Sequence, residues 1–181
     1  VYDQMSVVGR YQNFRELYQV QIKGDRTPTQ LTYGLRASQP AFSPSGKELL
    51  FVQQKGAGTD LVLFQLSNSK TKTILSSRLG ERYSDPTFVN QNQFVFSWRT
   101  KSSSDKLYLY DLTTGRMSPI LNDFNEANRS LYTRQGLFFV SSKNGINNLY
   151  LSNDFNGQTA GTAVAISNTT TSIQDADWDS K

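Results

Sequence analysis

The chain repeats one pattern four times, at intervals of about 44 residues. The pattern is a Leu that opens an alternating apolar run, and the spacings between successive copies are 61−17=44, 107−61=46 and 149−107=42. A second apolar run precedes each Leu across a polar or Gly-bearing loop, so each pair of runs predicts a β-hairpin. The four leucines are Leu17, Leu61, Leu107 and Leu149, and the preceding runs are Met5–Val8, Leu49–Val52, Phe94–Ser97 and Leu137–Val140. Such a period is typical of repeat folds.

Two further runs complete each repeat. One follows the hairpin after a Gly or Asn turn, at Thr29–Thr32, Lys72–Leu75, Ser118–Leu121 and Ala163–Ile166. The other precedes the hairpin and is anchored by Phe42, Phe88, Leu131 and Trp178. Four short strands in each period, without the 3.6-residue spacing of amphipathic helices, predict an all-β propeller of four-stranded antiparallel blades.

The length is compatible with about four blades, since 181/4 is about 45 residues. We therefore expect residues 1–181 to form a single β-propeller domain or a propeller segment, with repeat units at approximately 1–36, 37–81, 82–124 and 125–171. Residues 172–181 would then be the first strand of a further or ring-closing blade. A closed small ring and a segment of a larger propeller are both compatible with these boundaries of the repeat units.

The composition excludes several kinds of chemistry. The chain contains no Cys and no His, which rules out a thiolate nucleophile, a Ser-His-Asp triad and imidazole metal ligands within these residues. We expect no enzymatic activity and no cofactor. The net charge is +4, but Lys and Arg are scattered, so we expect no nucleic-acid partner. No apolar run reaches the length of about 18 residues that a membrane-spanning helix needs.

One segment resembles a known repeat. Residues 41–52, A-F-S-P-S-G-K-E-L-L-F-V, contain a Pro-Ser-Gly turn between two strands. They resemble the PD40 repeat of TolB-like β-propellers, which is related to WD40 repeats and usually reads W/F-S-P-D-G-K. Ser45 stands where the family has Asp, and the other units match less closely. The resemblance implies a propeller that binds other proteins in the periplasm or another extracytoplasmic compartment.

Oxygen-bearing side chains stand three residues before each first-strand anchor. They are Gln39, Asp85, Asn128 and Asp175. Equivalent positions in a propeller surround one mouth of the channel, so these residues are candidates for binding a partner. Asp85 and Asp175 are weak candidates for Ca²⁺ ligands. Alternatively, the four side chains hydrogen-bond the neighbouring backbone and tie the start of one blade to the next.

Two arginines, Arg36 and Arg82, stand six residues before their anchors and are further candidates at the same mouth, as donors to an anion or as solvated rim residues. The expected function is a non-catalytic protein-binding scaffold of the bacterial cell envelope, with an envelope protein or polymer as partner. One alternative is a gating propeller of a serine peptidase whose catalytic domain lies outside this chain. A second is a carbohydrate-binding or carbohydrate-active propeller, whose catalysis would depend on the separation of Asp85 and Asp175.

Overall fold

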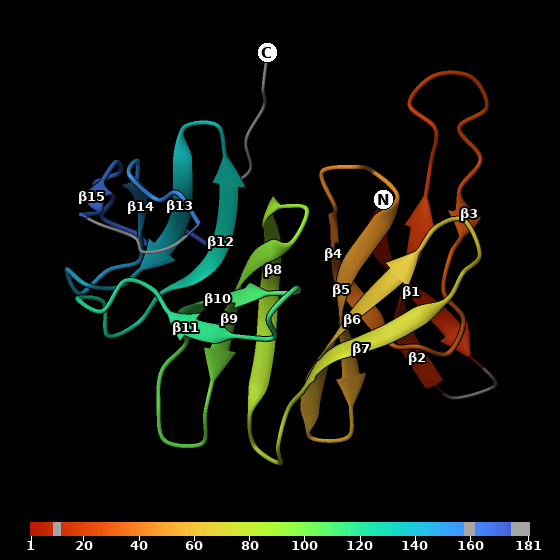
Figure 1. Cartoon of the computed structure of the whole chain (residues 1–181), viewed down its shortest axis with the longest axis horizontal. Helices are drawn as coiled ribbons and strands as arrows, with labels where there is room; N and C mark the ends of the chain where they lie inside the picture. Colours follow the sequence, from red (N-terminus) through yellow and green to blue (C-terminus); the bar gives the residue numbers. More distant parts are fainter. Residues whose placement is uncertain (9–11, 158–161, 175–181) are drawn as a thin grey trace. The chain divides into compact units, whose positions relative to one another are not determined.

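The computed structural model describes residues 1–8, 12–157 and 162–174, which form fifteen β-strands and no helix. In this described part, no helical segment has the length and apolar character that crossing a bilayer requires. The chain divides into two compact units, Val1–Arg82 and Tyr83–Lys181 (Figure 1). Each unit contains two antiparallel sheets.

The first unit contains a three-stranded and a four-stranded sheet. Their strands are β1 (Tyr2–Val8), β2 (Gln12–Gln19) and β3 (Thr29–Gln30), then β4 (Ala37–Phe42), β5 (Glu48–Lys55), β6 (Gly58–Gln65) and β7 (Thr71–Ser76). In both sheets the strands lie in chain order. Apolar residues from the two sheets meet in one core, formed by Leu17, Ala37, Leu49, Phe51, Val62 and Phe64.

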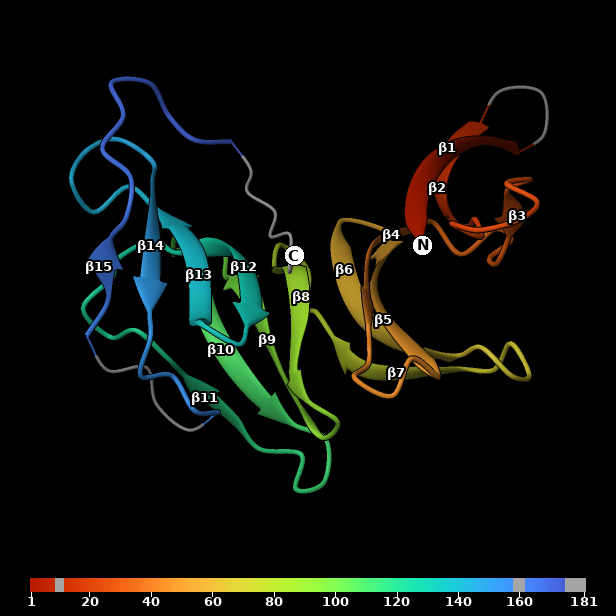
Figure 2. The ribbon, with the colours of Figure 1, turned by 90° about the horizontal axis from the view of Figure 1, so that it is seen from above.

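The second unit contains two four-stranded sheets, which lie face to face in Figure 2. Their strands are β8 (Arg82–Asn90), β9 (Gln93–Arg99), β10 (Lys106–Asp111) and β11 (Met117–Pro119), then β12 (Asn128–Thr133), β13 (Gly136–Ser141), β14 (Asn148–Ser152) and β15 (Val164–Ala165). The core between them includes Val95, Leu107, Leu137, Phe139 and Tyr150.

Three of the repeat leucines lie in the third strand of their sheets, where the sequence pattern predicts them, and Leu17 lies in β2, the strand that follows β1 in the three-stranded sheet. Leu61, Leu107 and Leu149 pair with Val52, Ser97 and Val140 of the preceding strand. All four sheets are antiparallel and each contains the strand after the hairpin, so the predicted all-β propeller architecture of four-stranded blades is confirmed.

The Pro-Ser-Gly turn also forms as the sequence indicates. The backbone N–H of Gly46 donates to the carbonyl of Ser43 at 2.8 Å, and the N–H of Ser43 donates to the carbonyl of Glu48 at 2.9 Å. Gly46 has φ +68°, a left-handed conformation that glycine adopts without steric cost. This turn connects β4 to β5.

The β1–β2 hairpin forms as predicted, but its register at the repeat Leu differs from that of the β5–β6 hairpin. Alignment on the repeats places Val8 opposite Leu17, but the structure pairs Leu17 with Asp3, five positions earlier (8−3=5). The β1–β2 hairpin therefore continues for five residue pairs from the Leu17 pair to its loop, compared with three from the Leu61 pair in the β5–β6 hairpin, and Met5 and Val7 are 55% and 78% exposed rather than buried. Hydrophobicity alone marks Met5–Val8 as a strand and does not determine its register against β2 or its exposure.

The expectation that residues 172–181 supply a first strand falls largely on residues 175–181, including the anchor Trp178, and these lie outside the described residues. Within the described part, the first sheet has three strands and the other three sheets have four.

Candidate partner-binding site at the first strands

Two of the first strands, β4 and β12, contain a β-bulge. In β4, Gln39 and Pro40 lie between the paired residues Ser38 and Ala41, opposite the single residue Phe51. The same irregularity occurs in β12 between Asn128 and Leu131. A bulge of this kind bends the strand and redirects its side chains.

The first residue of each of these two bulges has a left-handed backbone, and so does Asp85 in β8. The φ angles are 53° for Gln39, 51° for Asp85 and 51° for Arg129. Non-glycine residues rarely adopt this conformation, in which Asp and Asn are the most tolerated side chains. The three positions are therefore structurally equivalent, and they mark where each first strand turns.

This equivalence corrects the sequence alignment of the fourth repeat by one residue. Asn128 pairs with Val140 as Ser38 pairs with Val52, so Asn128 corresponds to Ser38 and Arg129 corresponds to Gln39. The true anchor of this strand is accordingly Tyr132 rather than Leu131. The sequence pattern favoured Leu131 as the anchor because it is more hydrophobic than the adjacent Tyr132.

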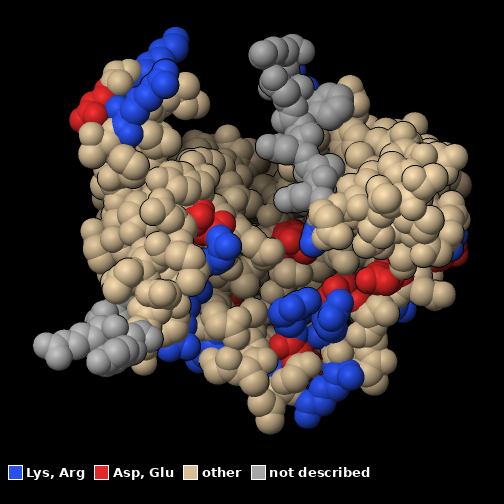
Figure 3. Space-filling view, turned by 180° about the vertical axis from the view of Figure 1, so that it is seen from behind, with Lys and Arg blue, Asp and Glu red and all other residues tan. Residues whose placement is uncertain are grey.

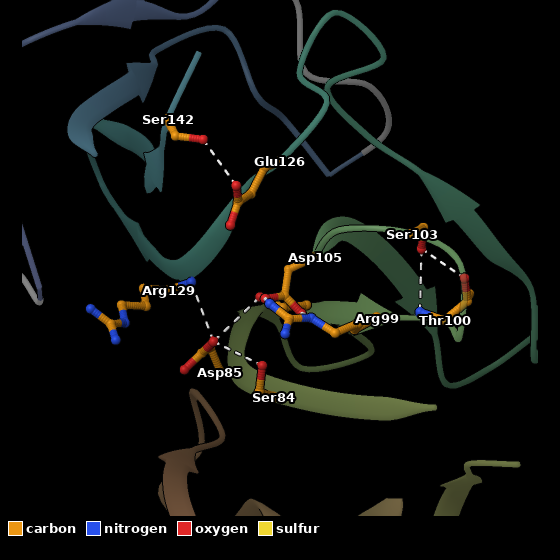
Figure 4. Close-up of polar contacts among 10 residues, drawn as sticks. Ser84, Asp85, Arg99, Thr100, Ser103, Asp105, Glu126, Arg129 and Ser142 are labelled. Carbon is orange, nitrogen blue, oxygen red and sulfur yellow. Dashed lines mark hydrogen bonds and ion pairs between the residues drawn. The ribbon is translucent and has the colours of Figure 1, made fainter. Parts of the chain in front are cut away.

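Asp85 connects two consecutive first strands. Its Oδ2 atom accepts hydrogen bonds from the Ser84 hydroxyl at 3.0 Å, the Ser97 hydroxyl at 3.4 Å and the backbone N–H of Arg129 at 3.3 Å (Figure 4). The hydroxyl of Ser130 donates to the Asp85 carbonyl at 3.2 Å. We call these five residues the Asp85 cluster. For Asp85, the interpretation that the side chain ties one blade to the next therefore agrees with the structure.

Further polar contacts hold the loops beside this cluster. Arg99 binds Asp105 through two hydrogen bonds, of 3.1 Å from Nε and 2.5 Å from the terminal nitrogen (Figure 4). The Ser142 hydroxyl donates to the carboxylate of Glu126 at 2.9 Å. Asp105 is 3% exposed, so this ion pair is better shielded than an ordinary surface pair. The β13–β14 loop is thus fixed to the chain that leads into β12, and so is the β9–β10 loop, because the N–H of Ala127 donates to the Asp105 carbonyl at 2.8 Å.

The cluster uses the backbone of Arg129 but leaves its side chain exposed. In Figure 4 the guanidinium extends away from the Asp85 carboxylate, which is held by the Arg129 N–H instead. A guanidinium on a backbone fixed in this way can bind a carboxylate or phosphate through two parallel hydrogen bonds. The sequence pattern did not indicate Arg129, because the neighbouring Asn128 was assigned to the position equivalent to Gln39 and Asp85.

The other sequence candidates are distributed over both units. Gln39 and Arg82 are exposed residues of the first unit, and Asn128 is a half-buried residue of the second. The guanidinium of Arg36 lies 3.8 Å from the centre of the Phe14 ring, a cation–π contact, so this arginine is partly engaged within its own unit.

Asp175 lies outside the described residues, so the proposed Asp85 and Asp175 pair, whether as Ca²⁺ ligands or as catalytic carboxylates, stays a prediction. The convergence of the candidate residues on one channel mouth also stays a prediction. Across the described ranges, no group of three or more Asp, Glu, His or Cys side chains has an arrangement that could hold a metal ion.

A second repeated polar feature was missed from the sequence. The residue immediately before the repeat Leu is buried in three of the four blades: Glu16 is 0% exposed, Asp60 is 1% exposed and Asn148 is 5% exposed. In the remaining blade this position is Lys106, which is exposed, and the buried acid Asp105 stands one residue earlier.

Each of these buried side chains accepts a hydrogen bond from a Ser or Thr at or after the outermost strand. Thr32 donates to Glu16 at 2.6 Å, Ser76 to Asp60 at 2.8 Å and Ser167 to Asn148 at 3.0 Å. Buried polar groups are costly unless hydrogen-bonded, which explains why the pairs recur together. The sequence signal was Glu, Asp or Asn directly before the repeat Leu.

Basic and acidic side chains lie beside one another on the face seen in Figure 3. This agrees with the scattered Lys and Arg of the sequence.

Comparison with known proteins places the fold. The described sheets are those of a β-propeller, and the solved structures to which the chain is similar include TolB proteins. TolB from Acinetobacter baumannii has 20% identity and a TM-score of 0.71, with 87% of this chain and 39% of that chain covered. A putative TolB from Agrobacterium tumefaciens has 15% identity and a TM-score of 0.67, with 85% and 55% covered. The fold is therefore a TolB-like β-propeller, and the chain spans about two fifths to about half of those relatives.

A third similar structure belongs to a study of prolyl endopeptidases, with 10% identity, a TM-score of 0.63, and 91% of this chain and 26% of that chain covered. No family model matches the sequence, and no curated protein matches it. The assignment of residues 41–52 to the PD40 repeat thus depends on the motif itself.

Proposed function

We propose that this chain is a non-catalytic propeller scaffold that binds a partner protein through its loop rims and the channel mouth. The observation that carries the proposal is the exposed guanidinium of Arg129 on a bulge whose backbone is fixed by Asp85. A preorganised charged group on a rigid strand binds a partner with little loss of conformational entropy. The absence of His and Cys from the sequence supports a binding role rather than a catalytic one.

We further propose that the partner is a protein or polymer of the bacterial cell envelope and that the chain acts in an extracytoplasmic compartment. The likeness in fold to two TolB structures supports this setting. A guanidinium favours carboxylate or phosphate groups, so the contacting surface of the partner is expected to be acidic.

Site-specific photo-cross-linking tests the proposal. A photoreactive amino acid replaces Arg129 in one variant and Asn92, an exposed residue of the β8–β9 turn, in the control. Both variants are irradiated in envelope and cytosolic extracts, and the products are identified by mass spectrometry. We expect one envelope protein to be linked at position 129 and not at position 92. Equal labelling at both positions, or labelling only by cytosolic proteins, would contradict the proposal.

A second candidate function is a gating propeller attached to a serine peptidase. The likeness in fold to a much longer prolyl endopeptidase chain favours it. In this case a catalytic domain with a G-x-S-x-G nucleophile turn would be encoded next to these residues. Sequencing the complete gene decides between the two candidates, because a scaffold needs no such domain.

A further inference from the structure

The second unit contains both Asn-Gly pairs of the sequence, Asn144-Gly145 and Asn156-Gly157. An Asn that precedes Gly is prone to spontaneous deamidation, because glycine has no side chain to obstruct the approach of its backbone nitrogen to the Asn side chain. The sequence does not distinguish the two pairs. The structure does, because one pair lies in an open turn and the other is packed against a neighbouring sheet.

The reaction is an attack of the chain on itself. The backbone nitrogen of the Gly bonds to Cγ of the preceding Asn, and the side-chain amide leaves as ammonia, which in the overall balance takes the proton of the attacking nitrogen. A cyclic imide remains. Water then opens the imide at either carbonyl group and yields Asp or isoaspartate. The protein controls the rate through the freedom of the backbone to bring the nitrogen onto Cγ.

The pair Asn144-Gly145 has this freedom. Both residues are exposed in the turn between β13 and β14. Gly145 has φ +88°, and a Cβ atom built on it would meet no atom within 4 Å. Its N–H donates to the carbonyl of Ser142 at 2.7 Å, and this bond must open before the reaction. Hydrogen bonds of exposed turns open at low free-energy cost, so this bond slows the reaction without preventing it.

The two ends of the same turn are fixed. The Ser142 hydroxyl donates to the carboxylate of Glu126 at 2.9 Å. Asn148 Oδ1 accepts from the Ser167 hydroxyl at 3.0 Å and from the N–H of Thr169 at 3.1 Å. The rearrangement is therefore confined to the tip of the turn, and β13 and β14 stay paired while it occurs.

The pair Asn156-Gly157 is constrained by packing. Gly157 is buried, and a Cβ atom built on it would lie 2.8 Å from Oε1 of Gln93 and 3.4 Å from the Val89 side chain. The preceding residue, Phe155, is 4% exposed and belongs to the core of the second unit. The backbone of this pair cannot adopt the imide geometry without displacing these neighbours, so its opening costs more free energy than that of the exposed turn.

We propose that Asn144 is a site of spontaneous deamidation in the folded protein and that packing protects Asn156. The product carries a new carboxylate beside Lys143, whose ammonium lies 4.3 Å from the centre of the Phe124 ring. Each event lowers the net charge of +4 by one. Isoaspartate also adds a methylene to the main chain at the tip of the turn. The proposal does not depend on the chain being a binding scaffold.

Peptide mapping of the 181-residue chain tests the proposal. The folded chain and the chain unfolded in urea are incubated at the same mildly alkaline pH. Samples are digested, and mass spectrometry measures the fraction of Asp and isoaspartate at each position over time. In urea both pairs lack tertiary contacts, so we expect their rates to agree within about threefold. In the folded chain we expect Asn144 to react at least about tenfold faster than Asn156.

Two variants identify the source of the acidic form. Isoelectric focusing of the intact folded chain should show an acidic species that grows with time. Asn144→Gln should abolish it, because the longer side chain forms the imide far more slowly. Asn92→Gln, the same change at an exposed Asn that does not precede Gly, should leave it unchanged. Circular dichroism confirms that both variants are folded.

Several results would overturn the proposal. They are equal rates at the two positions of the folded chain, a faster reaction at Asn156, no product at Asn144 of the folded chain, and an acidic species that persists in Asn144→Gln. A ratio of rates in urea equal to that in the folded chain would assign the difference to local sequence rather than to packing, and would also overturn it.

Discussion

The backbone N–H of Arg129 donates a hydrogen bond of 3.3 Å to the carboxylate of Asp85, although the two residues are 44 positions apart. This separation matches the repeat period, so the bond joins the same structural position in two consecutive blades. The carbonyl of Asp85 accepts a second bond from Ser130 at 3.2 Å. The first strands β8 and β12 are therefore connected to each other at their residues with left-handed φ, as well as to their own sheets.

Replacing Asp85 by Ala is expected to destabilise the protein by about 2–3 kcal/mol, because it leaves three donors without their acceptor and places Ala at a left-handed φ. Asp85→Asn keeps an acceptor oxygen and a side chain that tolerates this φ, so we expect a loss of about 1 kcal/mol or less. Urea denaturation measures both values. Asp123→Ala, at an exposed acid in the same unit, is the control and should change the free energy of unfolding by less than about 0.5 kcal/mol. An Asp85→Ala variant as stable as this control would refute the structural role.

Glu16 and Thr32 are expected to be energetically coupled, since the Thr32 hydroxyl donates to the buried Glu16 carboxylate and accepts from the N–H of Leu17. Glu16→Gln and Thr32→Val should each destabilise the protein by about 1–3 kcal/mol. The double variant should lose less than the sum, by about 0.5 kcal/mol or more. Equilibrium denaturation of the four proteins measures the coupling, and strict additivity would show that the two side chains act independently.

Tyr150→Phe is expected to leave the stability unchanged or to raise it by up to about 1 kcal/mol. The Tyr150 side chain is 3% exposed, and its hydroxyl has no hydrogen-bond partner within the described residues. Burial of this group raises the pKa of the phenol, and removing an unpartnered hydroxyl removes its desolvation cost. The contrasting control is Tyr18→Phe, which removes the contact with Ser6 and should lose about 0.5–1.5 kcal/mol. Thermal denaturation that ranks the two variants in the opposite order would contradict this account.

The free energy of unfolding is expected to decrease in acid, partly because the carboxylate of Asp111 becomes protonated. The backbone N–H of Thr114 lowers the pKa of this carboxyl below 3.8, with smaller contributions from Gln93 and Thr113, while desolvation opposes the shift. A carboxyl with a depressed folded-state pKa contributes stability above its unfolded pKa, and that contribution is lost as the pH falls through the folded value. Asp111→Asn does not titrate, so its free energy of unfolding should decrease less than that of the wild type between about pH 6 and about pH 2.5. Identical pH profiles would show that the Asp111 turn contributes nothing to acid sensitivity.

Much of the fold could be predicted because the repeat period and strand alternation are local properties of the sequence. Leu61, Leu107 and Leu149 lie in third strands because apolar residues alternate around them, and Gly46 lies in a turn because few other residues adopt its φ. The buried acids Glu16 and Asp60 were not recognised, since a charged side chain before a strand is ordinarily exposed.

The sequence by itself determined the number of strands in a repeat, the identity of the turns and the all-β class, because these depend on residues close together in the chain. Only the tertiary structure decided the register of β1 against β2, the exposure of Met5 and Val7, and the equivalence of Arg129 with Asp85. A bulge shifts the strand by one residue without changing its hydrophobic pattern, and a hairpin is buried only as far as its neighbouring sheet extends. Both effects arise from contacts between segments that are distant in sequence.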